Sequence, residues 1–379
     1  MLIKSNPFKF RIKLTHLFFL FLIGSTYSCK TLYSKTYKKT DLVDQNLSKS
    51  AKDLHKKLFF LTKKGFAIGH QDASAYGIGW KYDPSLNANK SDIYEVTGEQ
   101  PAMYSFEIGH IELNSKENLD SIRFDTMKTL IIDAHKRGGI ISLSWHPDNP
   151  TTGGSAWDSV PAVKDIIGKG IHKKKYNLWV SRVADFIKDL KYNGEDIPII
   201  FRPFHEMNGF WFWWGDPSTS PEDYKQLWRE TVHLLKDKHD IHNLMYGYAP
   251  NKLSPGYDYL KYYPGDDYVD FLGVDVYDFN NTEEFVSSLV NDLKILKRIA
   301  IKKNKLFALT ETGLEKIPTA NWFTEVLYPN IKNTGISWVL FWRNAHKSHY
   351  YLPYKGHKNA DDFKEFTTFP KTLMLKDIN

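Results

Sequence analysis

The sequence predicts an α/β fold, a (β/α)8 barrel that forms a single catalytic domain. Eight short apolar runs recur along the chain, mostly 27 to 43 residues apart, with one gap of 60. The runs are continuous rather than alternating, which is typical of parallel strands buried on both faces. They end near His70, Glu107, His146, Glu206, Ala249, Val276, Glu311 and Trp342. Eight such units over about 315 residues favour a closed barrel.

A doubly wound open sheet is the main alternative to the barrel. Amphipathic segments at 176–190 and 224–235 predict helices between the strands. No glycine-rich phosphate loop follows the first apolar run, however, and such a loop is the signature of the open nucleotide-binding sheet. The barrel is therefore the preferred fold.

The N-terminus has the organisation of an export signal. Four basic residues precede an apolar stretch at 17–23, which is too short to span a membrane. The stretch is soon followed by Cys29, an order that resembles a bacterial lipoprotein signal, in which the cysteine is lipidated and becomes the mature N-terminus. We predict a signal peptide at 1–28 and a membrane-anchored protein, periplasmic or at the cell surface. A plain signal peptide and a secreted protein are the alternative.

The predicted signal peptide is followed by a tether and then by the folded domain. Residues 29–45 include a polar stretch without apolar periodicity and are predicted to be a tether, and 46–379 are predicted to form the barrel domain. Helical spacing connects the apolar positions Leu47, Ala51, Leu54, Leu58 and Leu61. We expect this helix to cover the bottom or the side of the barrel. Cys29 is the only cysteine, which excludes an internal disulfide and a thiolate metal cluster.

The basic character of the chain is confined to its beginning. The formal net charge is +7, but residues 1–64 carry 14 Lys and Arg against 3 Asp and Glu. Residues 65–379 therefore carry 37 basic and 41 acidic residues, which is a net charge of −4. A folded domain of that charge lacks the basic surface that nucleic acid requires, so we expect no nucleic-acid partner.

Polar and aromatic residues gather where the predicted strands end. In (β/α)8 barrels the C-terminal ends of the strands form the active site, so these residues should share one cleft. Glu206 and Glu311 end the fourth and seventh runs, on opposite sides of the barrel mouth. Cleavage of a glycosidic bond needs two such carboxylates. The aromatic stretch at 210–214 follows Glu206 directly and could stack on the apolar faces of sugar rings.

Simpler interpretations exist for each of these features. A glutamate at a strand end is more often an ion-pair partner, a tryptophan-rich stretch is usually core, and His146 and His205 could be ordinary hydrogen-bonding histidines. A metal site is disfavoured because no His-Glu-x-x-His occurs and because His205 and Glu206, adjacent on a strand, would point to opposite faces. No Gly-x-Ser-x-Gly elbow appears. We predict neither a metal nor a cofactor.

The segment 202–215, RPFHEMNGFWFWWG, resembles the acid/base signature of glycoside hydrolase family 26, the β-mannanase family. Further segments that resemble this family are 69–72, 144–147, 273–277, 310–313 and 341–344. Together they cover roughly residues 58–350, in order and without a missing element. The resemblance implies a (β/α)8 barrel and hydrolysis with retention of configuration by double displacement.

The resemblance also implies roles for individual residues. Glu206 would be the general acid/base and Glu311 the nucleophile. His205 and Tyr277 would hold the nucleophile and the sugar in place by hydrogen bonds. Trp211 and Trp342 would stack on the sugar. His146 and Arg343 would lie on the wall of the cleft. An acid kept protonated beside aromatic rings should have a raised pKa, whereas a nucleophile among hydrogen-bond donors should stay ionised. Glu107 stands where an aspartate is expected, which bears on the outer cleft and on fine specificity.

We therefore expect a monomeric, retaining endo-β-1,4-mannanase that acts on mannan or galactomannan. An exo-acting mannobiose-releasing enzyme, a β-1,3-xylanase and a mixed-linkage β-glucanase remain alternatives within the same fold and mechanism. A glycan-binding protein on an inactive hydrolase scaffold is an alternative of another class. It has no need of both Glu206 and Glu311, so their presence argues against it.

Overall fold

A computed structural model describes residues 42–379. The predicted signal peptide, Cys29 and most of the predicted tether lie outside the described residues. The described part belongs to one compact unit, Thr40–Asn379, and the architecture below refers to that unit alone.

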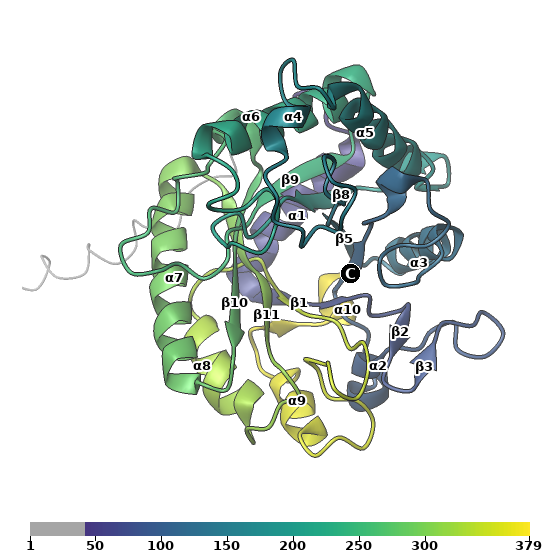
Figure 1. Cartoon of the computed structure of the whole chain (residues 1–379). Coiled ribbons are helices and arrows are strands. Elements are labelled where there is room, and N and C mark those ends of the chain that lie inside the picture. Colours follow the sequence, from purple (N-terminus) through teal and green to yellow (C-terminus); the bar gives the residue numbers. More distant parts are fainter. Residues whose placement is uncertain (1–41) are drawn as a thin grey trace, which may run out of the picture. The chain divides into compact units, whose positions relative to one another are not determined.

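Eight parallel strands close into a barrel, as the sequence predicts (Figure 1). The strands are β1 (Phe66–Gln71), β4 (Met103–Glu107), β5 (Ile140–Trp145), β8 (Ile199–Pro203), β9 (Leu244–Tyr248), β10 (Phe271–Asp278), β11 (Leu306–Leu314) and β12 (Trp338–Phe341). Strand β12 pairs with β1 from Ala67↔Trp338 to His70↔Phe341, and this pairing closes the ring. An open sheet would instead end in two unpaired edge strands. The doubly wound alternative is therefore wrong.

Helices surround the barrel and connect most of its strands (Figure 1). They are α2 (Asp92–Thr97), α3 (Phe124–Lys136), α4 (Val163–Ile166), α5 (Lys173–Lys188), α6 (Pro221–His233), α7 (Thr282–Lys303), α8 (Tyr328–Ile331), α9 (Ala360–Phe366) and α10 (Leu375–Ile378). The two predicted helical segments correspond to α5 and to α6, which continues into the π-helical turn η2 (Leu234–Lys238). No helix of the described residues is long and apolar enough to cross a bilayer.

Short elements occupy the longer connections between strands. They are β2 (Tyr76–Gly77), β3 (Trp80–Lys81), η1 (Ile111–Leu113), β6 (Lys191–Tyr192), β7 (Glu195–Asp196), η3 (Asp266–Tyr268), η4 (Trp322–Leu327) and β13 (Thr372–Leu373). The predicted gap of 60 residues before Glu206 contains α4, α5 and the β6–β7 hairpin. These additions explain why the fourth unit is longer than the others.

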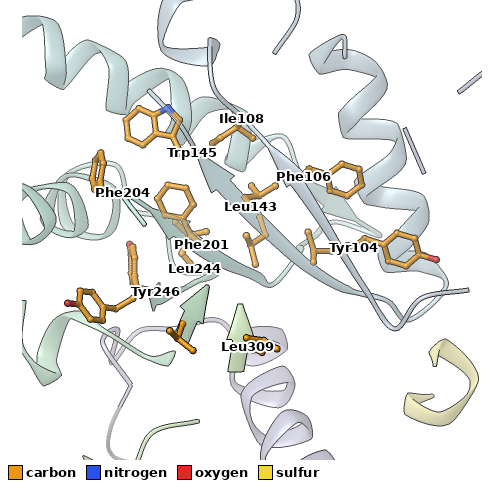
Figure 2. Close-up of a cluster of buried hydrophobic side chains, with 14 of the residues drawn as sticks. Tyr104, Phe106, Ile108, Leu143, Trp145, Phe201, Phe204, Leu244, Tyr246 and Leu309 are labelled. Atoms are coloured by element: carbon orange, nitrogen blue, oxygen red, sulfur yellow. The ribbon is translucent and has the colours of Figure 1, made fainter. Parts of the chain in front are cut away.

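Both faces of the barrel strands are buried, which accounts for their continuous apolar sequences. Outward-facing rings such as Phe106, Phe201 and Tyr246 pack in the layer between strands and helices (Figure 2). Inward-facing side chains near the strand starts, including Met103 and Met245, form a second apolar cluster. Toward the C-terminal ends the inward positions become polar, with the residues Ser105, Ser142, Arg202 and Asp275.

Helix α1 (Lys49–Lys64) closes the N-terminal end of the barrel. Its predicted apolar face is buried in the cluster that contains the first inward-facing strand residues. Ser48 caps the helix by accepting a hydrogen bond from the Ala51 N–H at 3.2 Å. The folded body begins before the predicted boundary at residue 46, because the Val43 N–H donates to the buried carboxylate of Asp270 at 2.8 Å. A buried carboxylate needs such donors, so this end of the predicted tether is held on the barrel.

Candidate active site

A β-bulge in β11 turns Glu311 into the barrel. Asp275 of β10 pairs with Glu311, although the preceding pair is Val274↔Leu309, so Thr310 is the extra residue. Strict alternation from the outward-facing Leu309 would place Thr310 inward and Glu311 outward. The bulge lets both side chains face inward. Gly273 makes room for this, because a Cβ at its position would lie 2.4 Å from the Thr310 side chain.

Glu311 is held by two hydrogen-bond donors. The Tyr277 hydroxyl donates to Oε2 at 2.8 Å, and the Arg202 guanidinium donates to Oε1. The predicted contact with Tyr277 is therefore present. The predicted hydrogen bond from His205 to the nucleophile is wrong, because the Nε2 to Oε1 distance is 3.8 Å. Arg202 occupies the position that we expected for His205.

Arg202 bridges two buried carboxylates. Its Nη1 donates to Oδ2 of Asp275 at 3.0 Å, and Asp275 also accepts from the Thr310 hydroxyl at 2.6 Å. Burial and the charge of Glu311 raise the pKa of Asp275, although Arg202 opposes them. Arg202 was not among the predicted site residues, although a charged residue directly after the apolar run 197–201 was an available signal. A buried arginine at this point must have anionic partners.

The same carboxylates are the only described residues that approach a metal-binding arrangement. Potential ligand atoms of His205, Asp275 and Glu311 lie within 4.8 Å of one another. The guanidinium of Arg202 already contacts both carboxylates, so a cation there would meet a fixed positive charge. One of the two reasons given against a metal is wrong, because β8 ends at Pro203 and neither His205 nor Glu206 lies on a strand.

Glu206 lies in a tight turn beyond β8. Its backbone is in the left-handed region, with φ +54°, and its N–H donates to the Ala249 carbonyl at 2.8 Å. Such a conformation is costly for a residue with a side chain and occurs often at functional sites. Trp211 Nε1 donates to Oε2 of Glu206 at 2.9 Å. Gly209 permits this contact, because a Cβ there would lie 2.3 Å from the indole.

The environment of Glu206 suits a general acid. Burial, together with the negative charge of Glu311, raises the pKa of Glu206 to about 8, against the opposing effect of the Trp211 hydrogen bond. Glu206 is thus protonated at neutral pH, while Glu311 accepts from a cationic donor and a hydroxyl. Two carboxyl groups with such different surroundings are the arrangement that acid and nucleophile roles require.

The raised pKa of Glu206 predicts a pH dependence. If the protonated form is required, kcat/KM falls as the pH rises through about 8. Trp211→Phe removes a donor that lowers this pKa, so the alkaline limb should move to higher pH. Steady-state values of kcat/KM between pH 4 and 10 locate the alkaline limb in each protein. In Glu206→Gln the limb should disappear, and an unshifted limb in Trp211→Phe would contradict the assignment.

His146 forms a buried ion pair with Glu107. Its Nδ1 lies 2.7 Å from Oε2 of Glu107, which also accepts from the Ser144 hydroxyl at 2.6 Å. Burial alone would lower the pKa of His146, but the charge and hydrogen bond of Glu107 and the charge of Glu311 together outweigh it, so the pKa is raised. Glu107 therefore supports His146 from within the barrel, and its expected effect on the outer cleft stays a prediction. Trp157, which was not among the predicted site residues, stacks on the imidazole of His146. The ring centroids are 5.3 Å apart and the angle between the ring planes is 11°.

Arg343 is anchored by side chains from two other segments. It donates to Asp120 and to the Tyr76 hydroxyl, which in turn donates to Asp72 at 2.8 Å. Burial raises the pKa of Asp120 to about 6, and the charge of Arg343 opposes this shift. Asp120 was not singled out because it follows no predicted strand, and only the folded chain brings it to Arg343.

Comparison with known proteins decides which family this site belongs to. The sequence model of the family described as Glycosyl hydrolase family 26 matches residues 43–350. The chain belongs to this family. A mannan endo-1,4-beta-mannosidase of Bifidobacterium adolescentis is 31% identical over 89% of the chain, and one of Bacillus subtilis is 29% identical over 64%. The chain spans 36% and 65% of the lengths of these two relatives.

A solved structure of a family 26 β-mannanase from Bacteroides ovatus resembles the whole folded domain. It is 42% identical with a TM-score of 0.84, and the match covers 86% of this chain and 95% of the other. The barrel is thus the family 26 architecture.

The family 26 aromatic stretch divides into core and cleft residues. Phe212, Trp213 and Trp214 are buried, and the indole of Trp214 donates to the His205 carbonyl at 2.8 Å. The simpler interpretation of the aromatic stretch, as part of the core, is therefore correct for these three residues. Trp211 and Trp342 are only half-buried, and Trp211 contacts Glu206 directly.

Replacement of either half-buried tryptophan tests its contact with substrate. Trp211→Ala and Trp342→Ala should each lower kcat/KM about tenfold or more, because aromatic contacts contribute on the order of 1 kcal/mol. Tyr94→Ala removes an exposed ring on α2 and serves as the matched control. Steady-state kinetics at fixed pH give the ratio. Unchanged kinetics in both tryptophan variants would assign these rings to packing alone.

Proposed function

We propose that this protein is a retaining endo-β-1,4-mannanase that hydrolyses mannan or galactomannan. The observation that carries the proposal is the pair Glu206 and Glu311, one with a pKa of about 8 and the other fixed by Arg202 and Tyr277. The names of the Bifidobacterium adolescentis and Bacillus subtilis relatives support mannan as the substrate.

The site supports a double displacement. Glu311 attacks the anomeric carbon, the glycosidic C–O bond breaks, and the proton of Glu206 passes to the leaving oxygen. The Glu206 carboxylate then takes a proton from water, whose oxygen attacks the anomeric carbon and releases Glu311. The carboxyl of Glu206 is thereby restored to its protonated form. Tyr277 and Arg202 position Glu311 for the first step.

A substrate panel tests the proposed specificity. Purified protein is incubated with mannan, galactomannan, xylan and mixed-linkage glucan, and the products are sized over time. We expect intermediate-length oligosaccharides from both mannans at early times, as internal cleavage produces. Glu311→Gln protein is the control for contaminating activity. Mannobiose as the sole early product would indicate exo action, and activity confined to another glycan would indicate the xylanase or glucanase alternative.

We also propose that the protein is an exported, membrane-anchored lipoprotein and a monomer. Four basic residues, the apolar stretch 17–23 and Cys29 support the anchor. Cys29→Ala should leave hydrolysis by the purified protein intact and move the protein out of the membrane fraction of its native cell. Ser28→Ala is the control. Membrane association of Cys29→Ala protein would exclude the lipid anchor.

A further inference from the structure

Two exposed phenylalanines lie next to the aromatic residues that contact the catalytic pair. Phe210 is 73% exposed and Phe279 is 74% exposed. Exposed apolar residues are common on protein surfaces, and Leu86 and Ile171 are equally exposed. Their position beside Trp211 and Tyr277 at the mouth of the barrel, rather than their exposure, indicates a role in binding.

Phe279 lies directly beyond the C-terminal end of β10, next to Tyr277. Asp275 and Tyr277 contact the residues around Glu311, whereas Asp278 accepts hydrogen bonds from Thr282 and Trp322 on the helical side. Phe279 follows the end of β10, and its ring packs beside that of Tyr277, with the centroids 6.1 Å apart. Its ring therefore lies one step farther out from the nucleophile than Tyr277.

Phe210 has the corresponding place beside the acid/base. Among the described aromatic contacts its ring packs only against Trp211, in a T-shaped arrangement at 5.4 Å and 72°. Trp211 itself contacts Glu206. Each catalytic carboxyl thus has an aromatic neighbour, and each of those neighbours has an exposed phenylalanine beyond it.

The two phenylalanines are carried by segments that are fixed to one another. The Asn208 side chain donates to the Asn251 carbonyl at 2.9 Å and accepts from the Asn251 N–H at 2.8 Å. Asn251 forms a parallel bridge with Asp275 of β10. The loop that carries Phe210 is therefore tied to β10, and Phe279 directly follows the last residue of that strand. A contact residue on a fixed backbone segment loses less conformational freedom on binding than one on a mobile loop.

We propose that Phe210 and Phe279 are specificity-determining contacts for sugar residues beyond the two that flank the scissile bond. This inference rests on the proposed function and concerns the same polysaccharide. The occupant follows from continuity with the cleft, since a glycan held at Trp211 and Tyr277 must extend past them. The apolar C–H face of an outer sugar ring would pack on each phenyl ring.

A chain-length series tests the inference. Phe210→Ala, Phe279→Ala and the double variant are compared with the unmodified protein on β-1,4-mannotriose to mannohexaose. We expect kcat/KM for the shortest hydrolysed oligosaccharide to stay within about twofold, and kcat/KM for mannohexaose to fall about fivefold in each single variant. Phe60→Ala, which removes an exposed ring on α1 at the other end of the barrel, is the control.

The outcomes separate this inference from the proposed function. A loss that grows with chain length supports it, and Phe279→Tyr should then retain most of the activity. Equal losses on all oligosaccharides, or no loss, would overturn it. Thermal unfolding of each variant shows whether the domain is intact. If the unmodified protein hydrolyses no mannan oligosaccharide, the proposed function fails and the contacts have no mannan to bind.

Discussion

Glu311→Ala protein is expected to lose turnover on every substrate, with kcat reduced by about 10⁴-fold or more. Without this carboxylate no glycosyl-enzyme can form. The neighbouring carboxylate of Asp275 is buried and accepts hydrogen bonds from Arg202 and Thr310, so it cannot take the place of Glu311. Release of a chromogenic phenol from an aryl glycoside measures the loss. Glu325→Ala, which changes an exposed glutamate on η4, is the matched control.

Glu206→Ala protein should behave differently from Glu311→Ala protein. Activated aryl glycosides need no protonation of the leaving group, so their first step should survive while hydrolysis of the intermediate slows. The intermediate then accumulates as a burst of phenol, and azide should speed its breakdown. A mechanism-based fluorosugar should label Glu311. Label on another residue, or a burst from Glu311→Ala protein, would overturn the division of roles.

Arg202→Met is expected to lower both stability and activity. The substitution removes the positive charge between Asp275 and Glu311 and leaves two carboxylates buried without it. Loss of one partner from a buried ion pair costs about 3–5 kcal/mol in the free energy of unfolding. We expect kcat to fall by about 10²-fold or more, because the nucleophile loses a fixed donor.

Chemical denaturation and steady-state kinetics measure the two effects of Arg202→Met separately. Arg298→Met, on the exposed face of α7, is the control for loss of an arginine. Addition of Asp275→Asn should recover part of the stability, since one buried charge is then removed. Activity equal to that of the unmodified protein would show that Arg202 does not position Glu311.

The fold followed from the sequence because a barrel strand buried on both faces has a distinctive pattern. The eight predicted runs became the eight barrel strands, and the apolar face of 47–61 became the buried face of α1. Polar residues at the strand ends marked the mouth, so Glu206, Glu311, Tyr277 and His146 could be placed in one site. These predictions depend on local periodicity, which a sequence displays directly.

The local backbone at the catalytic residues could not be read in this way. Alternation along β11 predicts an outward Glu311, and only the bulge at Thr310, with the space left by Gly273, reverses it. Likewise, β8 ends before His205, and the left-handed turn at Glu206 replaces the expected strand. Bulges and such turns are stabilised by neighbouring strands and loops rather than by their own residues.

The sequence by itself determined the barrel, the helix at its base and the two carboxylates at the strand ends, because each follows from the order and spacing of residues along the chain. The tertiary structure alone decided which side chains hold them. Arg202 meets Asp275 and Glu311 across 73 and 109 residues, and Arg343 meets Asp120 across 223. Charges so distant in sequence become partners only when closure of the barrel buries them together, and burial makes their pairing necessary.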